Sequence, residues 1–166
     1  MNQPLLSFFL GFLLFPVIAA AAEPEPPLQD SEFAGAWRIT GGVPAGIDDG
    51  EPATAMPALI GVTIVFNART IDAPHPLGCT EATYEIRHLA ADMLFQGTLG
   101  DDAPARAQAL DLSPTAAPTL MAQCETGLFD YHLTQGSGDA APQLLIMLDR
   151  VIYALERDVN PTTTDR

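Results

Sequence analysis

Residues 75–88, "HPLGCTEATYEIRH", bring together several side chains of the types that bind a metal ion. The segment holds two of the three histidines, one of the two cysteines and two glutamates. A zinc site needs three or four such ligands in a compact arrangement. If residues 82–89 form a strand, Glu85 and His88 lie on its opposite faces, and Cys79 has a second cysteine with which it can pair. We therefore expect neither a metal site nor a cofactor here.

The partner of Cys79 is expected to be Cys124, the only other cysteine. Two cysteines in an exported chain most simply form a disulfide, because oxidising compartments preserve such bonds. The bridge would close a loop of about 46 residues and stabilise the fold by about 4 kcal/mol, less any strain. This interpretation makes segment 75–88 structural.

Asp130 and His132 are the second candidate for chemistry, since an aspartate that orients a histidine base is a common catalytic pair. At positions i and i+2 the two side chains share one face of a strand. No Gly-x-Ser-x-Gly context supplies a nucleophile. We expect a surface pair and assign no catalytic residue. A small hydrolase that uses Asp130 and His132 is kept as an alternative.

The first 22 residues are typical of a secretory signal peptide: they carry no charged side chain, and an apolar run over residues 5–18 leads into four alanines. The alternative is an uncleaved membrane anchor, because about 18 mostly apolar residues nearly span a bilayer. Gly11, Pro16 and the alanine-rich end favour cleavage. We expect a periplasmic or secreted protein without stable membrane insertion after the signal is removed.

Charge narrows the possible partners. The chain has 21 acidic residues against seven arginines and no lysine, which gives a formal net charge of −14. Nucleic acids and anionic lipid surfaces require cationic contacts, so both are disfavoured as partners. The charge is explained either by a solubilising surface or by attraction to a basic protein.

After a disordered lead over residues 23–32, the pattern predicts one mainly-β domain over residues 33–157, followed by a disordered tail over residues 158–166. Residues 41–57, rich in glycine and proline, are expected to form a long loop. The expected strands are 59–66, 69–72, 82–89, 93–99, 119–124, 128–133, 143–149 and 150–157, with one short helix at 102–112. Short turns between successive strands favour an antiparallel up-and-down meander that closes into a small barrel of about eight strands.

The stretch "FAGAWRIT", residues 33–40, resembles the Gly-x-Trp signature that opens the first strand of lipocalin-like barrels and of small exported META-type proteins. The match consists of Gly35 and Trp37, with Phe33 ahead of them. The whole chain is also similar to a group of small exported bacterial proteins with comparable "PHPLGC", "LFQG" and "FDYH" stretches. The resemblance implies a lipocalin-like or META-like β domain but no particular activity. The 41–57 loop and the helix near 104–111 depart from a minimal eight-stranded meander, so no binding residues are carried over.

The aromatic residues expected inside such a barrel, Trp37, Tyr84 and Tyr131, are the candidate ligand contacts. Trp37 could form the floor of a cavity or plug one end of the barrel, and the interiors of small barrels are usually filled by side chains. The leading hypothesis is a non-enzymatic exported binding or envelope-maintenance module. It would contact a small apolar ligand or a protein through the open end of the barrel or the 41–57 loop. The alternative is an inhibitor-like protein that recognises a basic exported protein such as a lysozyme.

Overall fold

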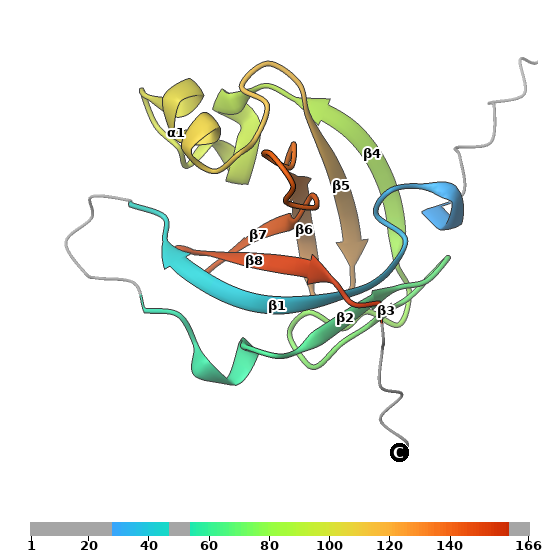
Figure 1. Ribbon diagram of the computed structural model, residues 1–166. Helices are drawn as coiled ribbons and strands as arrows, with labels where there is room; N and C mark the ends of the chain where they lie inside the picture. The colour runs from blue at the N-terminus through green and yellow to red at the C-terminus, as the bar shows by residue number, and fades with distance from the viewer. Residues whose placement is uncertain (1–27, 47–53, 160–166) are drawn as a thin grey trace, which may run out of the picture.

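Short runs of leucine, isoleucine, valine, threonine and aromatic residues, separated by turns, form eight antiparallel strands (Figure 1). The computed structural model describes residues 28–46 and 54–159. The strands are β1 (Gly35–Pro44), β2 (Thr63–Phe66), β3 (Ile71–Asp72), β4 (Thr83–Leu89), β5 (Ala117–Cys124), β6 (Gly127–Leu133), β7 (Leu144–Leu148) and β8 (Val151–Arg157). They form one sheet in the order β3-β2-β1-β8-β7-β6-β5-β4, so the first strand pairs with the last. The predicted mainly-β up-and-down meander is confirmed.

The sheet curls into a half-barrel, and its two edge strands, β3 and β4, are joined by a connection that we call the seam, residues 69–82. Ile71 and Cys79 exchange two backbone hydrogen bonds of 2.9 Å, and the Ala82 N–H donates to the Arg69 carbonyl at 2.7 Å. The Cys79–Cys124 disulfide, with Cα atoms 5.6 Å apart, ties the seam to the end of β5. The predicted disulfide is therefore confirmed, and it fits a protein that folds in an oxidising compartment.

Close backbone packing inside the seam requires a glycine. A Cβ atom at Gly78 would lie 2.2 Å from the Ala73 carbonyl oxygen, which no side chain can tolerate. Leu77 is fully buried in the core beneath this turn, and the His75–Pro76 peptide bond is cis. The tight turn thus brings Cys79 back beside β3.

The concave face of the sheet is filled by large side chains. Alternate residues of each strand point inward, as the two-residue period of a strand requires. Trp37, Tyr131 and Tyr153 are each at most 1% exposed, and the Tyr131 ring makes an edge-to-face contact with Phe66 at 4.8 Å. The interior of the half-barrel is thus a packed core.

A second core lies on the convex face of the sheet, beneath the segment that connects β4 to β5. This segment contains the 3-10 turn η3 (Ala91–Gly97) and the helix α1 (Ala103–Ala109), which lie together at one end of the sheet (Figure 1). Leu94 and Phe95 of η3 pack with Leu145 and Ile152 from the outer faces of β7 and β8. The convex face is therefore buried where η3 and α1 cover it.

Residues 93–99 were expected to form a strand, and that prediction is wrong. The segment is a 3-10 turn with a kink, in which Phe95 and Gln96 adopt φ angles of +49° and +58°. The kink buries Leu94 and Phe95 together while Met93 stays exposed, a pattern that strand alternation does not allow. The short helix, in contrast, is confirmed as α1.

The expected 41–57 loop is also partly wrong. Residues 41–44 continue β1 and pair with β8 beyond a bulge between Ile39 and Gly41. Gly42 permits this pairing, since a Cβ atom there would approach the Tyr153 ring within 2.9 Å. Another short 3-10 turn, η2 (Pro57–Leu59), precedes β2, which begins at Thr63 instead of residue 59. Residues 47–53 of the expected loop lie outside the described residues.

Both ends of the expected domain extend further than the sequence predicted. Leu28 begins the 3-10 turn η1 (Leu28–Asp30) and is buried in the core, so residues 28–32 are not a disordered lead. Asp158 is held by an ion pair with Arg38 at 2.5 Å and by a hydrogen bond from Thr63. The expected signal peptide, residues 1–22, and the tail from residue 160 lie outside the described residues. Among the residues described, no helix has the length and apolar character needed to cross a bilayer.

Candidate functional site

Two neighbouring strands, β6 and β7, diverge after a short paired stretch. Only two positions pair in the β6–β7 register, His132 with Leu145 and Leu133 with Leu144. Every other pair of neighbouring strands longer than two residues is paired over at least four positions. Figure 1 shows β6 running nearly across the direction of β7, so the sheet turns a corner here.

Because the strands diverge, two hydrogen-bonded residue pairs that a regular antiparallel ladder would contain are absent between β6 and β7. In an antiparallel pair, hydrogen-bonded positions recur every second residue. Continued pairing would therefore join Asp130 to Met147 and Leu128 to Asp149, but neither pair is in the register. These four residues are therefore not paired across the two strands.

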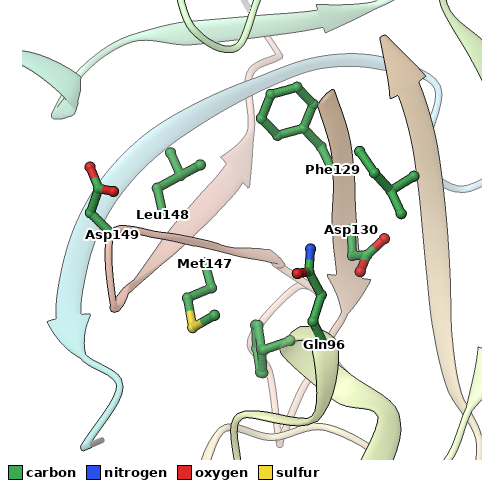
Figure 2. Close-up of a pocket in the computed structure, with 8 residues that line it drawn as sticks. Gln96, Phe129, Asp130, Met147, Leu148 and Asp149 are labelled. Carbon is green, nitrogen blue, oxygen red and sulfur yellow. The ribbon is translucent and has the colours of Figure 1, made fainter. Parts of the chain in front are cut away.

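A pocket with a volume of about 180 Å³ occupies this gap, and we call it the β6–β7 pocket. It is lined by Phe95, Gln96, Leu128, Phe129, Asp130, Met147, Leu148 and Asp149. Figure 2 shows Gln96 reaching from η3 into the space between the two strands, with Asp130 on the β6 side and Met147 and Asp149 on the β7 side. The pocket is thus bounded by two strands and one kinked turn.

The walls of the pocket come from both faces of the sheet. Phe129 and Leu148 pack against the concave core, whereas Phe95 and Met147 belong to the convex core beneath η3. Leu128, at the mouth, is 42% exposed. Side chains from both faces meet because the strands are separated, which gives the pocket an apolar wall and an open mouth.

Asp130 is the most unusual polar group of the pocket. Its Oδ1 atom is buried, and no group in the described part of the chain donates a hydrogen bond to it. Burial raises the pKa of the Asp130 carboxyl above its usual value, because the charged form loses hydration. Asp149, by contrast, lies exposed at the mouth. The pocket thus presents carboxylate acceptors, one of which has an unused buried oxygen.

The backbone around the pocket is held in conformations that side chains disfavour. Among the described residues, five that are not glycine have positive φ angles, and three of them, Phe95, Gln96 and Asp149, line the pocket. Asp149 and Arg150, with φ of +46° and +64°, form the two-residue turn between β7 and β8, where glycine or asparagine is usual. Such conformations cost on the order of 1 kcal/mol each and gather at functional sites.

Replacing Asp130 by asparagine should stabilise the fold at neutral pH by about 0.5–1 kcal/mol, because the variant removes a partly desolvated charge that has no partner. A raised native pKa means that the native state binds the proton more tightly than the unfolded state. The destabilisation is therefore complete at neutral pH and disappears as the pH falls below the unfolded pKa of about 3.9. Urea unfolding at pH 7 and pH 3.5 measures the difference. A variant that is less stable at pH 7 would contradict the absence of a partner.

His132, which the sequence placed at the surface beside Asp130, is fully buried beneath η3. Its Nε2 atom accepts a hydrogen bond from the Phe95 N–H at 3.1 Å. Its Nδ1 atom lies 2.9 Å from the Thr119 hydroxyl, which lies 3.2 Å from the Ala117 carbonyl and can donate to it. Because Nε2 accepts, Nδ1 carries the proton and donates to Thr119. The expectation of a surface pair is wrong for His132, because η3 covers it.

Both ring nitrogens of His132 therefore bond inside the protein, and burial lowers its pKa to about 4. The Phe95 ring packs on the imidazole edge-to-face at 4.4 Å. A general base must direct a free nitrogen lone pair at its substrate. The geometry of His132 instead fits a neutral side chain that anchors the kink of η3 to β5 and β6, and so positions Phe95 and Gln96 at the pocket.

The three aromatic residues proposed as ligand contacts lie elsewhere in the fold. The Trp37 indole N–H donates to the Phe33 carbonyl at 2.9 Å, and the Arg157 guanidinium covers the ring at 4.3 Å. Tyr84 donates to the Thr70 carbonyl at 2.8 Å across the seam. Tyr131 is fully buried on the concave face. None of the three lines the β6–β7 pocket.

The residues of segment 75–88 are spread along the seam and β4. His75 and His88 are exposed, and Glu85 forms an ion pair with Arg87 at 2.6 Å. Within the described ranges, one group of side chains is close enough together to hold a metal ion: Cys79, Cys124 and Glu125. The sulfur atoms of the two cysteines are, however, joined in the disulfide.

Glu125 has a structural role beside the disulfide. It accepts hydrogen bonds of 3.0 Å from both the backbone N–H and the hydroxyl of Thr80. The backbone hydrogen bond from Thr80 is the main cause that lowers the pKa of Glu125. The hairpin turn that carries Glu125 is thus linked to the seam by hydrogen bonds in addition to the Cys79–Cys124 disulfide.

The fold and the pocket define a mainly-β protein: a curled antiparallel meander with a filled interior, a disulfide across its seam and a side pocket where two strands diverge. Comparisons with protein-family models, with curated proteins and with solved structures find no match.

Proposed function

We propose that this chain is an exported, non-enzymatic binding module and that it holds its partner at the β6–β7 pocket. The observation that carries the proposal is the separation of β6 from β7 beyond two paired positions, which opens a partly apolar pocket lined by the half-buried Asp130, one of whose oxygens has no donor in the described part of the chain. Unsatisfied buried polar groups cost free energy unless a partner or water meets them. A bound partner that places donors or positive charge beside the Asp130 carboxylate would reduce this cost.

Two further features support a binding role at this position. The strained backbone of η3 and of the β7–β8 turn is held in place by specific contacts, including the hydrogen bond from Phe95 to His132. In preorganised sites of this kind, backbone strain lowers the stability of the fold but fixes the side chains before binding. The concave interior is occupied by Trp37, Tyr131 and Tyr153, so the side pocket fits a ligand better than the barrel centre does.

A hydrolytic function receives less support. His132 would need to release the hydrogen bond from Phe95 before it could accept a proton from a nucleophile. The pKa of about 4 favours a neutral anchoring residue. Export is proposed from the apolar N-terminal segment and the disulfide together.

Site-specific photo-crosslinking tests this proposal. A photoreactive phenylalanine analogue at Leu128, at the pocket mouth, should give a defined adduct in material kept in its own envelope. The matched control carries the same analogue at Val43 on β1 and should give no adduct. Val43 is 53% exposed and Leu128 is 42% exposed, so the two positions are similarly accessible. The adduct from position 128 should fall at least fivefold in the Asp130→Asn background. Equal adducts from both positions, or none from position 128, would reject the pocket as the binding site.

A further inference from the structure

The size of the β6–β7 pocket limits what it can hold. Pockets for small organic ligands usually measure about 300–1,000 Å³. The volume of about 180 Å³ is well below that range and suits one long side chain. The mouth, where Gln96, Leu128 and Asp149 are exposed, leaves a path to solvent through which a side chain can enter from a neighbouring molecule (Figure 2).

The polar groups of the pocket are suited to a cation that donates several hydrogen bonds. Asp130 lines the pocket from β6 and Asp149 lines it from the opposite side, at the end of β7, while Gln96 extends its amide between the two strands (Figure 2). None of the eight lining residues is an arginine, lysine or histidine. The buried Asp130 Oδ1 atom meets no donor in the described part of the chain. A guest that brings positive charge and N–H groups would compensate the partly desolvated Asp130 carboxylate from the side that lines the pocket.

The apolar lining separates arginine from other cations. The side chains of Phe129, Met147 and Leu148 can cover the aliphatic stem of a guest, and the face of an aromatic ring attracts a guanidinium. A guanidinium is planar, is more weakly hydrated than an ammonium and donates in a fork that matches carboxylates. The mixture of flat apolar walls and carboxylates therefore favours arginine over lysine.

From these observations we infer that the β6–β7 pocket receives one arginine side chain of a basic partner protein. The inference rests on the proposed function and names the chemistry of its ligand. A protein is favoured over free arginine because the net charge of −14 produces a long-range attraction that acts on the whole surface of a basic macromolecule. The lining also contains no cationic side chain to bind the carboxylate of a free amino acid.

The test uses the mature protein and three probes: N-acetyl-L-arginine methylamide, its neutral citrulline isostere and free L-arginine. Amide resonances in two-dimensional NMR report the position and saturation of binding. We expect the capped arginine to shift the amides of Leu128, Asp130 and Met147 with a dissociation constant on the order of 1–10 mM, as is reasonable for one partly exposed ion pair with apolar contact. The citrulline probe should bind at least tenfold more weakly.

Variants assign the effect to the pocket. Asp130→Asn should weaken binding of the capped arginine about tenfold and Asp149→Asn about threefold, while Asp72→Asn, exposed on β3 across the sheet, should leave it unchanged. Each variant is first shown to unfold at least as cooperatively as the parent, so a loss of binding is not a loss of fold. Raising the salt to 0.5 M, roughly a 4 Å Debye length, should weaken binding further.

Several outcomes would overturn the inference. Equal binding of the citrulline probe would show that charge is not recognised. Non-saturating shifts that persist in Asp130→Asn would show only diffuse attraction to an acidic surface. A tenfold preference for free L-arginine would replace the partner protein by a small molecule. No shift at 50 mM probe would reject arginine, and an intact Leu128 crosslink would then leave the binding function itself standing.

Discussion

Reduction of the Cys79–Cys124 disulfide should lower the free energy of unfolding by about 4 kcal/mol. The bridge joins residues separated by 45 positions, and a loop of that length restricts the unfolded chain by about this amount. It also ties the seam to β5 at the place where β3 and β4 would otherwise be free edges. Since small domains are stable by only about 5–15 kcal/mol, the loss would be a large share of the total. Urea unfolding with and without a phosphine reductant measures it.

The matched control is the Cys79→Ala/Cys124→Ala variant, whose stability should not respond to the reductant. Hydrogen exchange adds a local measurement. In the reduced protein the amides of Cys79 and Ala82, which bond to Ile71 and Arg69 across the seam, should exchange before those of the β7–β8 hairpin. A reduced protein as stable as the oxidised one would show that the seam is held by Glu125 and the backbone alone.

Acidification from pH 7 to pH 5 should destabilise the fold by about 2 kcal/mol through His132 alone. Burial lowers the native pKa of this residue to about 4, whereas an unfolded histidine titrates near 6.5. As the pH falls through 6.5, the histidine is protonated in the unfolded state but stays neutral in the native state. The contribution of His132 to the free energy of unfolding is therefore complete above pH 6.5 and is lost towards pH 4. Proton uptake on unfolding, close to one per molecule at pH 5.5 from this residue, checks the assignment.

The His132→Phe variant should remove this pH dependence while keeping the volume of the ring. It leaves the Phe95 N–H and the Thr119 hydroxyl without their partner, so we expect a loss of about 2 kcal/mol at pH 7. Its stability curve should then approach that of the parent near pH 5. His88→Asn, at an exposed position on β4, is the control and should keep the parental slope. A parental slope in His132→Phe would contradict the buried neutral histidine.

The sequence was most informative where a structure depends on neighbouring residues or on chemistry that does not need the fold. Alternation of Tyr84 and Ile86 with Glu85 and Arg87 predicted β4 almost to its ends, because the side chains of a strand alternate between faces whatever its partner. The disulfide was predicted because the chain has only two cysteines and its first 22 residues resemble an export signal.

The candidate site could not be predicted in this way. Asp130 was noticed only as a neighbour of His132, and Gln96, Met147 and Asp149 gave no signal of a site. The prediction of a strand over residues 93–99 was wrong because their apolar content is also typical of a strand. The kink at Phe95 is stabilised by His132, which lies 37 positions away in the sequence. The secondary-structure propensity of a segment is overridden when a different conformation allows a buried hydrogen bond and ring packing with distant residues.

The amino-acid sequence by itself determined the mainly-β antiparallel meander, the disulfide and the acidic character of the chain, since periodicity, turn residues and composition act over short distances or through charge. Only the tertiary structure decided where the curled sheet turns its corner, and hence that β6 and β7 separate beside Asp130. A strand must follow the twist of all the strands to which it is joined, so the place where pairing fails is a property of the whole sheet.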